Sequence, residues 1–176
     1  MINIKKVNLK HPTAGLGSMV YKLVSECPPL DQNSMYCNLL QCHHFSATSI
    51  AAIYQSELIG FISGYIIPKR PNTLFIWQVA VDKKARGIGL ALKMLSELLN
   101  KPGCSEVQYL ETSITAKNKA SWKLFERLAK NLEAPLHKSV LFDQFHHLNN
   151  QHDTEHLVKI GPFTESEIAD LISATH

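Results

Sequence analysis

Apolar residues recur at helical spacing through the first part of the chain. Between Ala14 and Cys27 they lie three or four positions apart, at Leu16, Met19, Val20, Leu23 and Val24. Pro28-Pro29 ends this predicted helix. A second helix is expected from Met35 to about His44, and a polar residue before it can cap its start: Asp31, Asn33 or Ser34. A short strand from Ile2 to Leu9 is expected before both helices.

After residue 48 the pattern becomes typical of strands. Ser49–Gln55 and Leu58–Ile67 are rich in apolar and β-branched residues and flank a tight turn at Ser56-Glu57. Pro68–Asn72 breaks the second strand, and Thr73–Val81 forms a third. Because the first connection is far too short for a parallel crossover, these three strands are predicted to pair antiparallel.

Helices and strands alternate in the remainder of the chain, where a helix can return the chain to a parallel neighbouring strand. The expected elements are a helix ending near Asn100, a strand at Val107–Ile114, a helix at Asn118–Asn131, a strand at His156–Ile160 and a helix at Thr164–Ala174 with a Thr164-x-x-Glu167 capping box. The result is an α/β protein.

Composition narrows the class of protein. The 176 residues suit one domain, 1–176, with a hydrophobic fraction of 45% that is typical of a globular chain. A net charge of +3 and a pI of about 8.6 fall short of a dedicated nucleic-acid binder. No apolar run is long enough to span a membrane, and no apolar leader precedes Val24, so we expect neither a membrane partner nor secretion.

The four cysteines, Cys27, Cys37, Cys42 and Cys104, form no CxxC pair. They are interpreted as reduced thiols of a cytoplasmic protein rather than as a zinc site. His152 and His156 have the i, i+4 spacing that can bind metal on a helix, but nearby Pro and Gly argue against a helix there. No metal is expected.

The most informative segment joins the strand that ends at Val81 to the next helix. Its sequence is Arg86-Gly87-Ile88-Gly89-Leu90-Ala91. Glycines let backbone N–H groups converge, and the positive end of a helix adds to them, which together suit a phosphate. The alternative is a plain strand–turn–helix joint with convenient glycines. The loop is neither a Walker loop nor a Rossmann fingerprint.

This loop and two further motifs resemble the GNAT-type acyltransferases. Arg86-x-x-Gly89-x-Ala91 resembles their pyrophosphate signature, Val79-Ala-Val81 their pantetheine-pairing strand, and Asn118-x-x-Ser121-x-x-Leu124-Phe125 their later helix motif. The resemblance implies a central, mixed, mostly antiparallel sheet flanked by helices, with acetyl-CoA as co-substrate. Its implied acetyl-CoA-binding residues are Val79, Val81, Arg86, Gly87, Gly89, Leu90, Ala91 and Asn118. Phe125 departs from the family, which often has a proton-donating Tyr there.

A narrower resemblance is to the L-2,4-diaminobutyrate acetyltransferases of ectoine biosynthesis. It runs from about Leu30 to Ala129, with weaker support from His152 to Pro162, and rests on four segments: Asp31–Cys42, Gly60–Tyr65, Arg70–Asp82 and Leu110–Thr115. This family transfers acetyl from acetyl-CoA to the 4-amino group of a small diamino acid. The resemblance also implies a homodimer, the commonest oligomer.

A substrate with two ammonium groups and a carboxylate needs acidic partners and a donor or cation. The candidate substrate-binding residues are Asp31, Tyr36, Trp77, Thr112 and His152. Trp77 can hold a cation on its ring face or donate its indole N–H. Each of three residues keeps an alternative: Asp31 as a helix cap, Trp77 as core, and His152 as part of a solvated loop.

Attack on a thioester needs a neutral amine, and at pH 7 only about a thousandth of an alkylammonium with a pKa of about 10 is neutral. Glu155 is the first candidate base and Glu111 the second, although a buried Glu111 could equally be structural. Tyr36 is a candidate proton donor. Backbone N–H groups of Val79–Val81 can stabilise the oxyanion, particularly if the strand is bulged.

Two other functions remain open at this stage. One is a GNAT enzyme that acetylates a polyamine or a protein amine. The other is a non-catalytic acyl-CoA sensor, which only the Phe125 departure favours. Fold alone does not choose among them.

Overall fold

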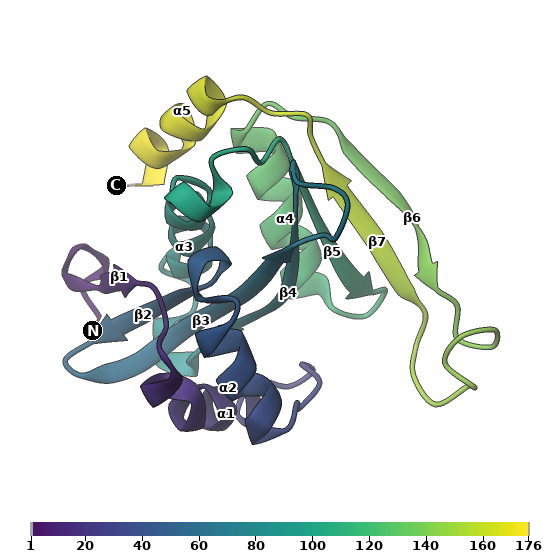
Figure 1. The fold of residues 1–176 in the computed structure, drawn as a ribbon, viewed down its shortest axis with the longest axis horizontal. Coiled ribbons are helices and arrows are strands. Elements are labelled where there is room, and N and C mark those ends of the chain that lie inside the picture. The colour runs from purple at the N-terminus through teal and green to yellow at the C-terminus, as the bar shows by residue number, and fades with distance from the viewer. Residues whose placement is uncertain (1, 176) are drawn as a thin grey trace.

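In the computed structural model, residues 2–175 are described, and they form one mixed sheet with helices on both faces (Figure 1). The strands are β1 Asn8–Lys10, β2 Ile50–Tyr54, β3 Glu57–Ile66, β4 Thr73–Val81, β5 Tyr109–Thr115, β6 Leu136–Phe142 and β7 Glu155–Ile160. The helices are α1 Gly17–Ser25, α2 Met35–His43, α3 Leu90–Leu99, α4 Lys119–Asn131 and α5 Glu165–Thr175. The seven strands are ordered β1-β2-β3-β4-β5-β7-β6.

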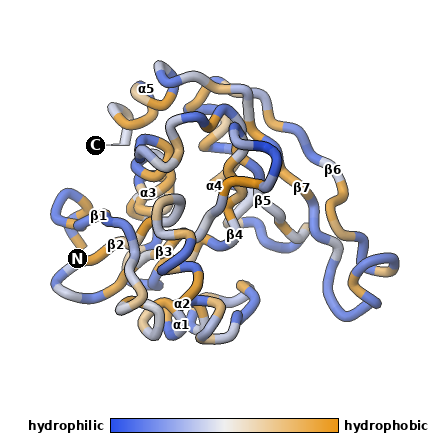
Figure 2. The backbone as a smooth tube through the Cα atoms, viewed as in Figure 1, coloured by the Kyte–Doolittle hydropathy of each residue, from blue (hydrophilic) through white to orange (hydrophobic). Residues whose placement is uncertain are grey.

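The sheet separates two hydrophobic cores, because side chains alternate between its faces. One core joins α1 and α2 to the sheet through residues such as Val20, Phe61 and Ala80. The larger core joins α3, α4 and α5 to the other face through residues such as Leu95 and Leu128. Figure 2 shows hydrophobic residues concentrated where helices meet the sheet, and mostly hydrophilic residues in the loop joining β6 to β7.

The predicted pairing is confirmed in the centre of the sheet. β2, β3 and β4 pair antiparallel, and β4 and β5 pair parallel after the α3 crossover. The fold class, a mixed and mostly antiparallel sheet flanked by helices, is therefore confirmed.

The structure differs from the sequence prediction most clearly in three features. The first strand is only Asn8–Lys10, because Ile4–Lys6 forms a 3₁₀ turn capped by the Asn3 side chain. The tight turn lies at Gln55 and Ser56, both with positive φ, one residue earlier than predicted. Strand β6 was missed altogether, because most of this edge strand is exposed and it lacks the alternation that marks a half-buried strand.

Two irregularities of β4 shape the functional end of the sheet. Ser63 pairs with Gln78 and Gly64 with Ile76, so Trp77 is an extra residue that bulges from the strand. The parallel pairing with β5 also ends at Ile76–Thr112, although both strands continue. β5 stays paired with β7 from Leu110 to Thr115 while it loses β4 after Thr112, so β4 and β5 diverge beyond this point.

Candidate active site

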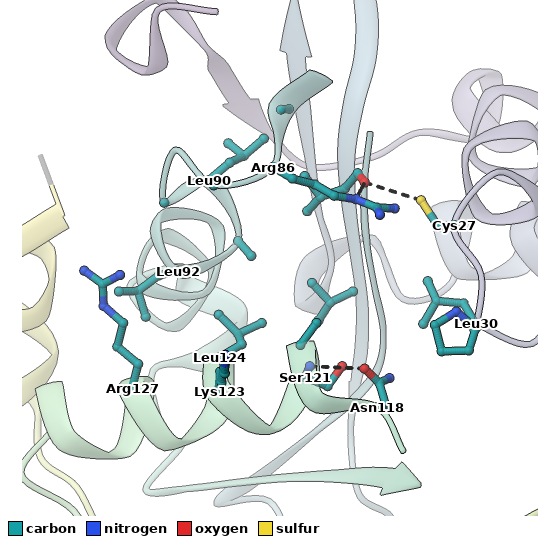
Figure 3. Close-up of a pocket in the computed structure, with 18 of the residues that line it drawn as sticks. Cys27, Leu30, Arg86, Leu90, Leu92, Asn118, Ser121, Lys123, Leu124 and Arg127 are labelled. Carbon is teal, nitrogen blue, oxygen red and sulfur yellow. Dashed lines mark hydrogen bonds between the residues drawn. The ribbon is translucent and has the colours of Figure 1, made fainter. Parts of the chain in front are cut away.

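A cleft lies between the end of β4, the loop after it and helix α4 (Figure 3). All eight residues proposed to bind acetyl-CoA line it: Val79, Val81, Arg86, Gly87, Gly89, Leu90, Ala91 and Asn118. The sequence placed these residues on a strand end, a loop, a helix start and a second helix. The structure brings the four pieces together around a single space.

The two glycines of the loop keep the floor of the cleft open. Gly87 and Gly89 have φ of +77° and +84°, a conformation that side chains disfavour, and a Cβ on either would meet no atom within 4 Å. Gly89 is also the N-cap of α3. The first backbone N–H groups of a helix have no intrahelical partner, so this concave loop suits a phosphate or pyrophosphate.

The backbone edge of β4 facing the cleft is available to an extended ligand. Asp82 N donates to Ile59 O on β3. Along an antiparallel strand, residues that bond to the neighbouring strand alternate with residues that do not, so the N–H and C=O groups of Val79 and Val81 point away from β3. Consistent with this, Val81 O accepts hydrogen bonds from Arg86 Nε at 3.0 Å and from Cys27 Sγ at 3.4 Å (Figure 3). The edge can therefore pair with the amides of a pantetheine arm.

Other cleft residues were not proposed from the sequence as acetyl-CoA-binding, although Ser121 and Leu124 belong to the helix motif that supports the resemblance. One wall comes from the segment after α1, Cys27, Pro28, Pro29 and Leu30, and another from α4, with Ser121, Lys123, Leu124 and Arg127. The α4 residues recur at helical spacing, a signal that could have revealed them. Phe125, by contrast, is buried in the larger core and is not among the residues that line the cleft.

Asp31 lies directly after Leu30 of the cleft wall. The structure assigns the N-cap of α2 to Ser34, whose Oγ accepts from Cys37 N at 3.1 Å. The capping alternative for Asp31 is therefore wrong, and its carboxylate is not used at the helix start. The Asp31 backbone carbonyl accepts a hydrogen bond from Gln78 Nε2 at 2.6 Å.

Glu155 is half-buried at the start of β7, opposite Thr115 of β5. Burial raises the pKa of its carboxyl group, and the nearby Asp31 carboxylate also raises it, whereas a hydrogen bond with Ser113 and the charges of His156 and His152 oppose the rise. The charges of Asp31 and Glu155, which are far apart in sequence, thus act on one another in the folded chain.

The three remaining substrate-side candidates are accessible to a ligand. Trp77 is 41% exposed and contacts Tyr65 edge-on, with ring centroids 6.2 Å apart, so it is not a core residue. Tyr36 is exposed in the first turn of α2. His152 is exposed in the loop before β7, and His156 lies in that strand rather than on a helix.

Glu111 and Thr112 are already engaged by the protein. Both carboxylate oxygens of the buried Glu111 accept from Arg70, at 2.7 and 2.9 Å, and this bond raises the pKa of Arg70. Thr112 Oγ1 donates to Ile76 O at 3.0 Å, where β4 and β5 separate. The ion pair is what the structural alternative for Glu111 expects, and the Thr112 hydroxyl bridges the strand junction; the roles of both residues at the site stay predictions.

Residues 2–175 contain no group of three or more His, Cys, Asp or Glu side chains that could hold a metal ion. Over the same range, no helix is both long and apolar enough to cross a membrane.

Comparisons with known proteins agree with this geometry. The acetyltransferase (GNAT) family matches residues 18–129. The L-2,4-diaminobutyric acid acetyltransferase of Methylotuvimicrobium alcaliphilum is 56% identical over 157 residues, which cover 89% of this chain and 91% of that protein. The enzyme of the same name from Chromohalobacter salexigens is 45% identical, covering 93% of this chain and 85% of its own.

Solved structures extend the similarity to the fold. The diaminobutyrate acetyltransferase of Paenibacillus lautus, in complex with L-2,4-diaminobutyric acid and coenzyme A, has a TM-score of 0.86 at 35% identity, covering 90% of this chain and 96% of that one. The ribosomal-protein-S18-alanine N-acetyltransferase of Escherichia coli has a TM-score of 0.70 at 11% identity, with 90% and 95% of the two chains covered. At that identity only the fold is shared.

Proposed function

The chain belongs to the acetyltransferase (GNAT) family and, within it, to the diaminobutyrate acetyltransferases, and we propose from this premise that it acetylates the 4-amino group of L-2,4-diaminobutyrate. The products are N4-acetyl-L-2,4-diaminobutyrate and CoA, as needed in ectoine biosynthesis. The observation that supports this substrate class best is the pair of carboxylates on the substrate side, Asp31 directly after the cleft-lining Leu30 and Glu155 at the start of β7, which suit a compound with two ammonium groups.

Acetyl-CoA fits the cleft on three features of the chain. The open Gly87–Gly89 loop at the start of α3 suits the pyrophosphate, the free edge of β4 suits the pantetheine amides, and Asn118 closes the far side. When bound, acetyl-CoA supplies an activated thioester. Trp77 and Gln78 precede Val79 on the same strand, so the substrate-side residues lie next to the end of that edge.

Glu155 acts as the general base in this proposal, directly or through a water molecule. Its raised pKa makes it a stronger base than an ordinary carboxylate. Asp31 and the Trp77 ring hold the ammonium groups, and His152 or Tyr36 supplies polar contacts at the rim.

Backbone N–H groups next to the Trp77 bulge stabilise negative charge that develops on the thioester oxygen. The leaving thiolate, with a pKa of about 8.5 for a simple thiol, needs little acid assistance. Tyr36 can provide it, since Phe125 cannot. Direct transfer of this kind requires no metal.

The decisive assay follows thiol release from acetyl-CoA with four amines in parallel: L-2,4-diaminobutyrate, ornithine, spermidine and a lysine peptide. We expect diaminobutyrate to be preferred and mass spectrometry with NMR to place the acetyl group on N4. Preference for spermidine or the peptide would favour another GNAT activity, and no turnover with tight CoA binding would favour an acyl-CoA sensor.

We propose two further properties of this enzyme. It acts in the cytoplasm, in keeping with four free cysteines, Cys27, Cys37, Cys42 and Cys104. It is also a homodimer. The edge strand β6, which carries the exposed Val140 and Phe142, provides a surface that a second copy can cover, and sedimentation at several concentrations tests this.

A further inference from the structure

Gln78 is a buried amide that connects the acetyl-CoA strand to the loop before α2. Its side chain is on β4, immediately after the Trp77 bulge, and the residue is 7% exposed. Gln78 Nε2 donates to Asp31 O at 2.6 Å, and Gln78 Oε1 accepts from Asn33 Nδ2 at 2.8 Å. One side chain therefore holds two points of a loop that is distant in sequence.

The direction of these bonds is determined by chemistry. A backbone carbonyl only accepts, so the atom facing Asp31 O must be the NH₂ group of Gln78. The oxygen of Gln78 must then face Asn33, whose NH₂ group donates to it. Neither amide can turn over without placing like groups together, so the pair locks the loop in one arrangement.

The bulge makes this connection possible. Side chains normally alternate along a strand, which would place Trp77 and Gln78 on opposite faces. Here Gln78 reaches the loop before α2, and Trp77 contacts Tyr65, which in turn contacts Phe45 just after α2. Trp77 and Gln78 thus point to the same side of the sheet although they are consecutive. Trp77 is exposed to a ligand, and Gln78 is bonded to the loop.

We propose that Gln78 is a positioning residue that sets the Asp31 carboxylate for the diamino acid and ties that half of the site to the acetyl-CoA strand. This inference rests on the proposed function for the identity of the substrate. Gln78 touches no reacting atom in this scheme. It acts through the Asp31 backbone, so its loss should affect the amine substrate far more than acetyl-CoA.

The test compares Gln78→Leu, which keeps the approximate size and removes both bonds, with Gln78→Glu and Asn33→Ala. Gln78→Glu keeps the oxygen that accepts from Asn33 but loses the NH₂ group that donates to Asp31 O. Asn33→Ala keeps that NH₂ group but removes the bond from Asn33 that fixes the orientation of the Gln78 amide. We expect KM for diaminobutyrate to rise about tenfold in Gln78→Leu and Gln78→Glu, and less in Asn33→Ala, with KM for acetyl-CoA within twofold of wild type.

Ser63→Ala is the matched control. Ser63 is the cross-strand partner of Gln78, is also buried, and its hydroxyl has no hydrogen-bond partner among the described residues. Its removal disturbs the same place in the sheet without loosening the loop, so both KM values should stay near wild type.

Hydrogen–deuterium exchange gives a readout that needs no substrate. Faster exchange across residues 30–34 in Gln78→Leu, but not in Ser63→Ala, is the expected result. Unchanged exchange together with an unchanged KM for diaminobutyrate would overturn the inference, as would an equal rise in both KM values. If wild-type protein does not acetylate diaminobutyrate, the proposed function fails instead, and the exchange result still decides whether Gln78 holds the loop.

Discussion

The acetyl-CoA cleft and the amine-binding side of the site are assembled in different ways. The cleft is built mainly from short consecutive motifs, Val79–Ala91 and the start of α4, each of which carries its own local geometry. The amine side combines Asp31, Trp77, Gln78 and Glu155 from segments that meet only in the folded chain. A local motif can be recognised in sequence, whereas a composite site depends on how strands pair.

The two regions also use different chemistry. The cleft offers backbone N–H groups and glycines to its ligand, so a side chain added there should weaken acetyl-CoA binding by filling the space. The amine side offers ionisable side chains, so removing a charge there should impair binding or turnover of the amine. Variants of the two regions should therefore separate the kinetic constants for the two substrates.

The largest effect is expected for Glu155→Gln. It keeps size and hydrogen bonding but removes the base, so kcat should fall about 10²–10⁴-fold at neutral pH and recover partly at high pH, where the amine loses its proton unaided. Because the pKa of Glu155 is raised, the acidic limb of the wild-type kcat profile should lie at a higher pH than for a carboxyl group with its usual pKa. pH–rate profiles of both proteins check this.

Glu111→Gln is the comparison variant for that experiment. It should retain kcat while lowering stability by only about 1 kcal/mol, since Glu111 loses its charged partner but the Arg70 side chain is 46% exposed and water screens its unpaired charge. Loss of kcat in Glu111→Gln alone would return the role of base to Glu111. A rise in KM without loss of kcat in Glu155→Gln would mean that Glu155 only binds an ammonium group.

Gly89→Val should weaken acetyl-CoA binding about tenfold or more, because a β-branched residue is strained at φ +84° and its side chain occupies the space of the pyrophosphate. Isothermal titration with acetyl-CoA measures the change. Gly15→Val is the control, since a Cβ there meets only Thr13 Oγ1, at 3.7 Å. Unchanged affinity in folded Gly89→Val would place the pyrophosphate elsewhere.

Asp31→Ala should raise KM for diaminobutyrate about tenfold and leave KM for acetyl-CoA unchanged, since it removes one ammonium partner. Steady-state kinetics with each substrate varied in turn separates the two constants. Glu126→Ala removes a carboxylate that pairs with Lys138 on the outer side of α4 and should change neither. If Asp31→Ala behaves like this control, Asp31 does not bind the amine.

Lys123→Ala and Arg127→Ala test the α4 wall of the cleft, where Figure 3 shows Arg127 rising toward Leu92. Water and salt screen the attraction between an exposed cation and a phosphate. Affinity for CoA should therefore fall only a few-fold in either variant, and by less at high salt. Lys130→Ala, on the same helix but outside the cleft lining, is the control. An effect of Lys130→Ala as large as the others would indicate a general charge effect.

The smallest expected effect is on stability. A carboxyl group whose folded-state pKa lies above its unfolded value stabilises the fold at low pH and loses that contribution as pH rises through the folded pKa. Ionised Glu155 is therefore unfavourable to folding at neutral pH, and Glu155→Gln should raise Tm slightly at pH 7 but not at pH 4. A lower Tm at pH 7 would mean that the Ser113 hydrogen bond outweighs desolvation.

Several outcomes were accessible from sequence because they depend on neighbouring residues. The helical spacing of α1 and α2, the antiparallel pairing of β2–β4 and the Thr164-Glu167 capping box follow from local rules, and the structure agrees. Seven of the eight proposed acetyl-CoA residues lie in the continuous segment Val79–Ala91, whose local geometry the sequence carries, whereas Asn118 joins them only through the fold. Strand β6 was not accessible, because an exposed edge strand is stabilised by its partner β7 rather than by its own pattern.

Within the composite site, the sequence by itself determined the inventory of charges but not their partners. Glu111 and Glu155 both begin as carboxylates near a strand, and pairing alone decides that Arg70 engages one while the other lies beside Asp31. The Trp77 bulge is likewise invisible in the sequence, because it exists only as a mismatch between β3 and β4. Local geometry is encoded by neighbours along the chain, whereas electrostatic environment depends on neighbours in space, which only the tertiary structure sets.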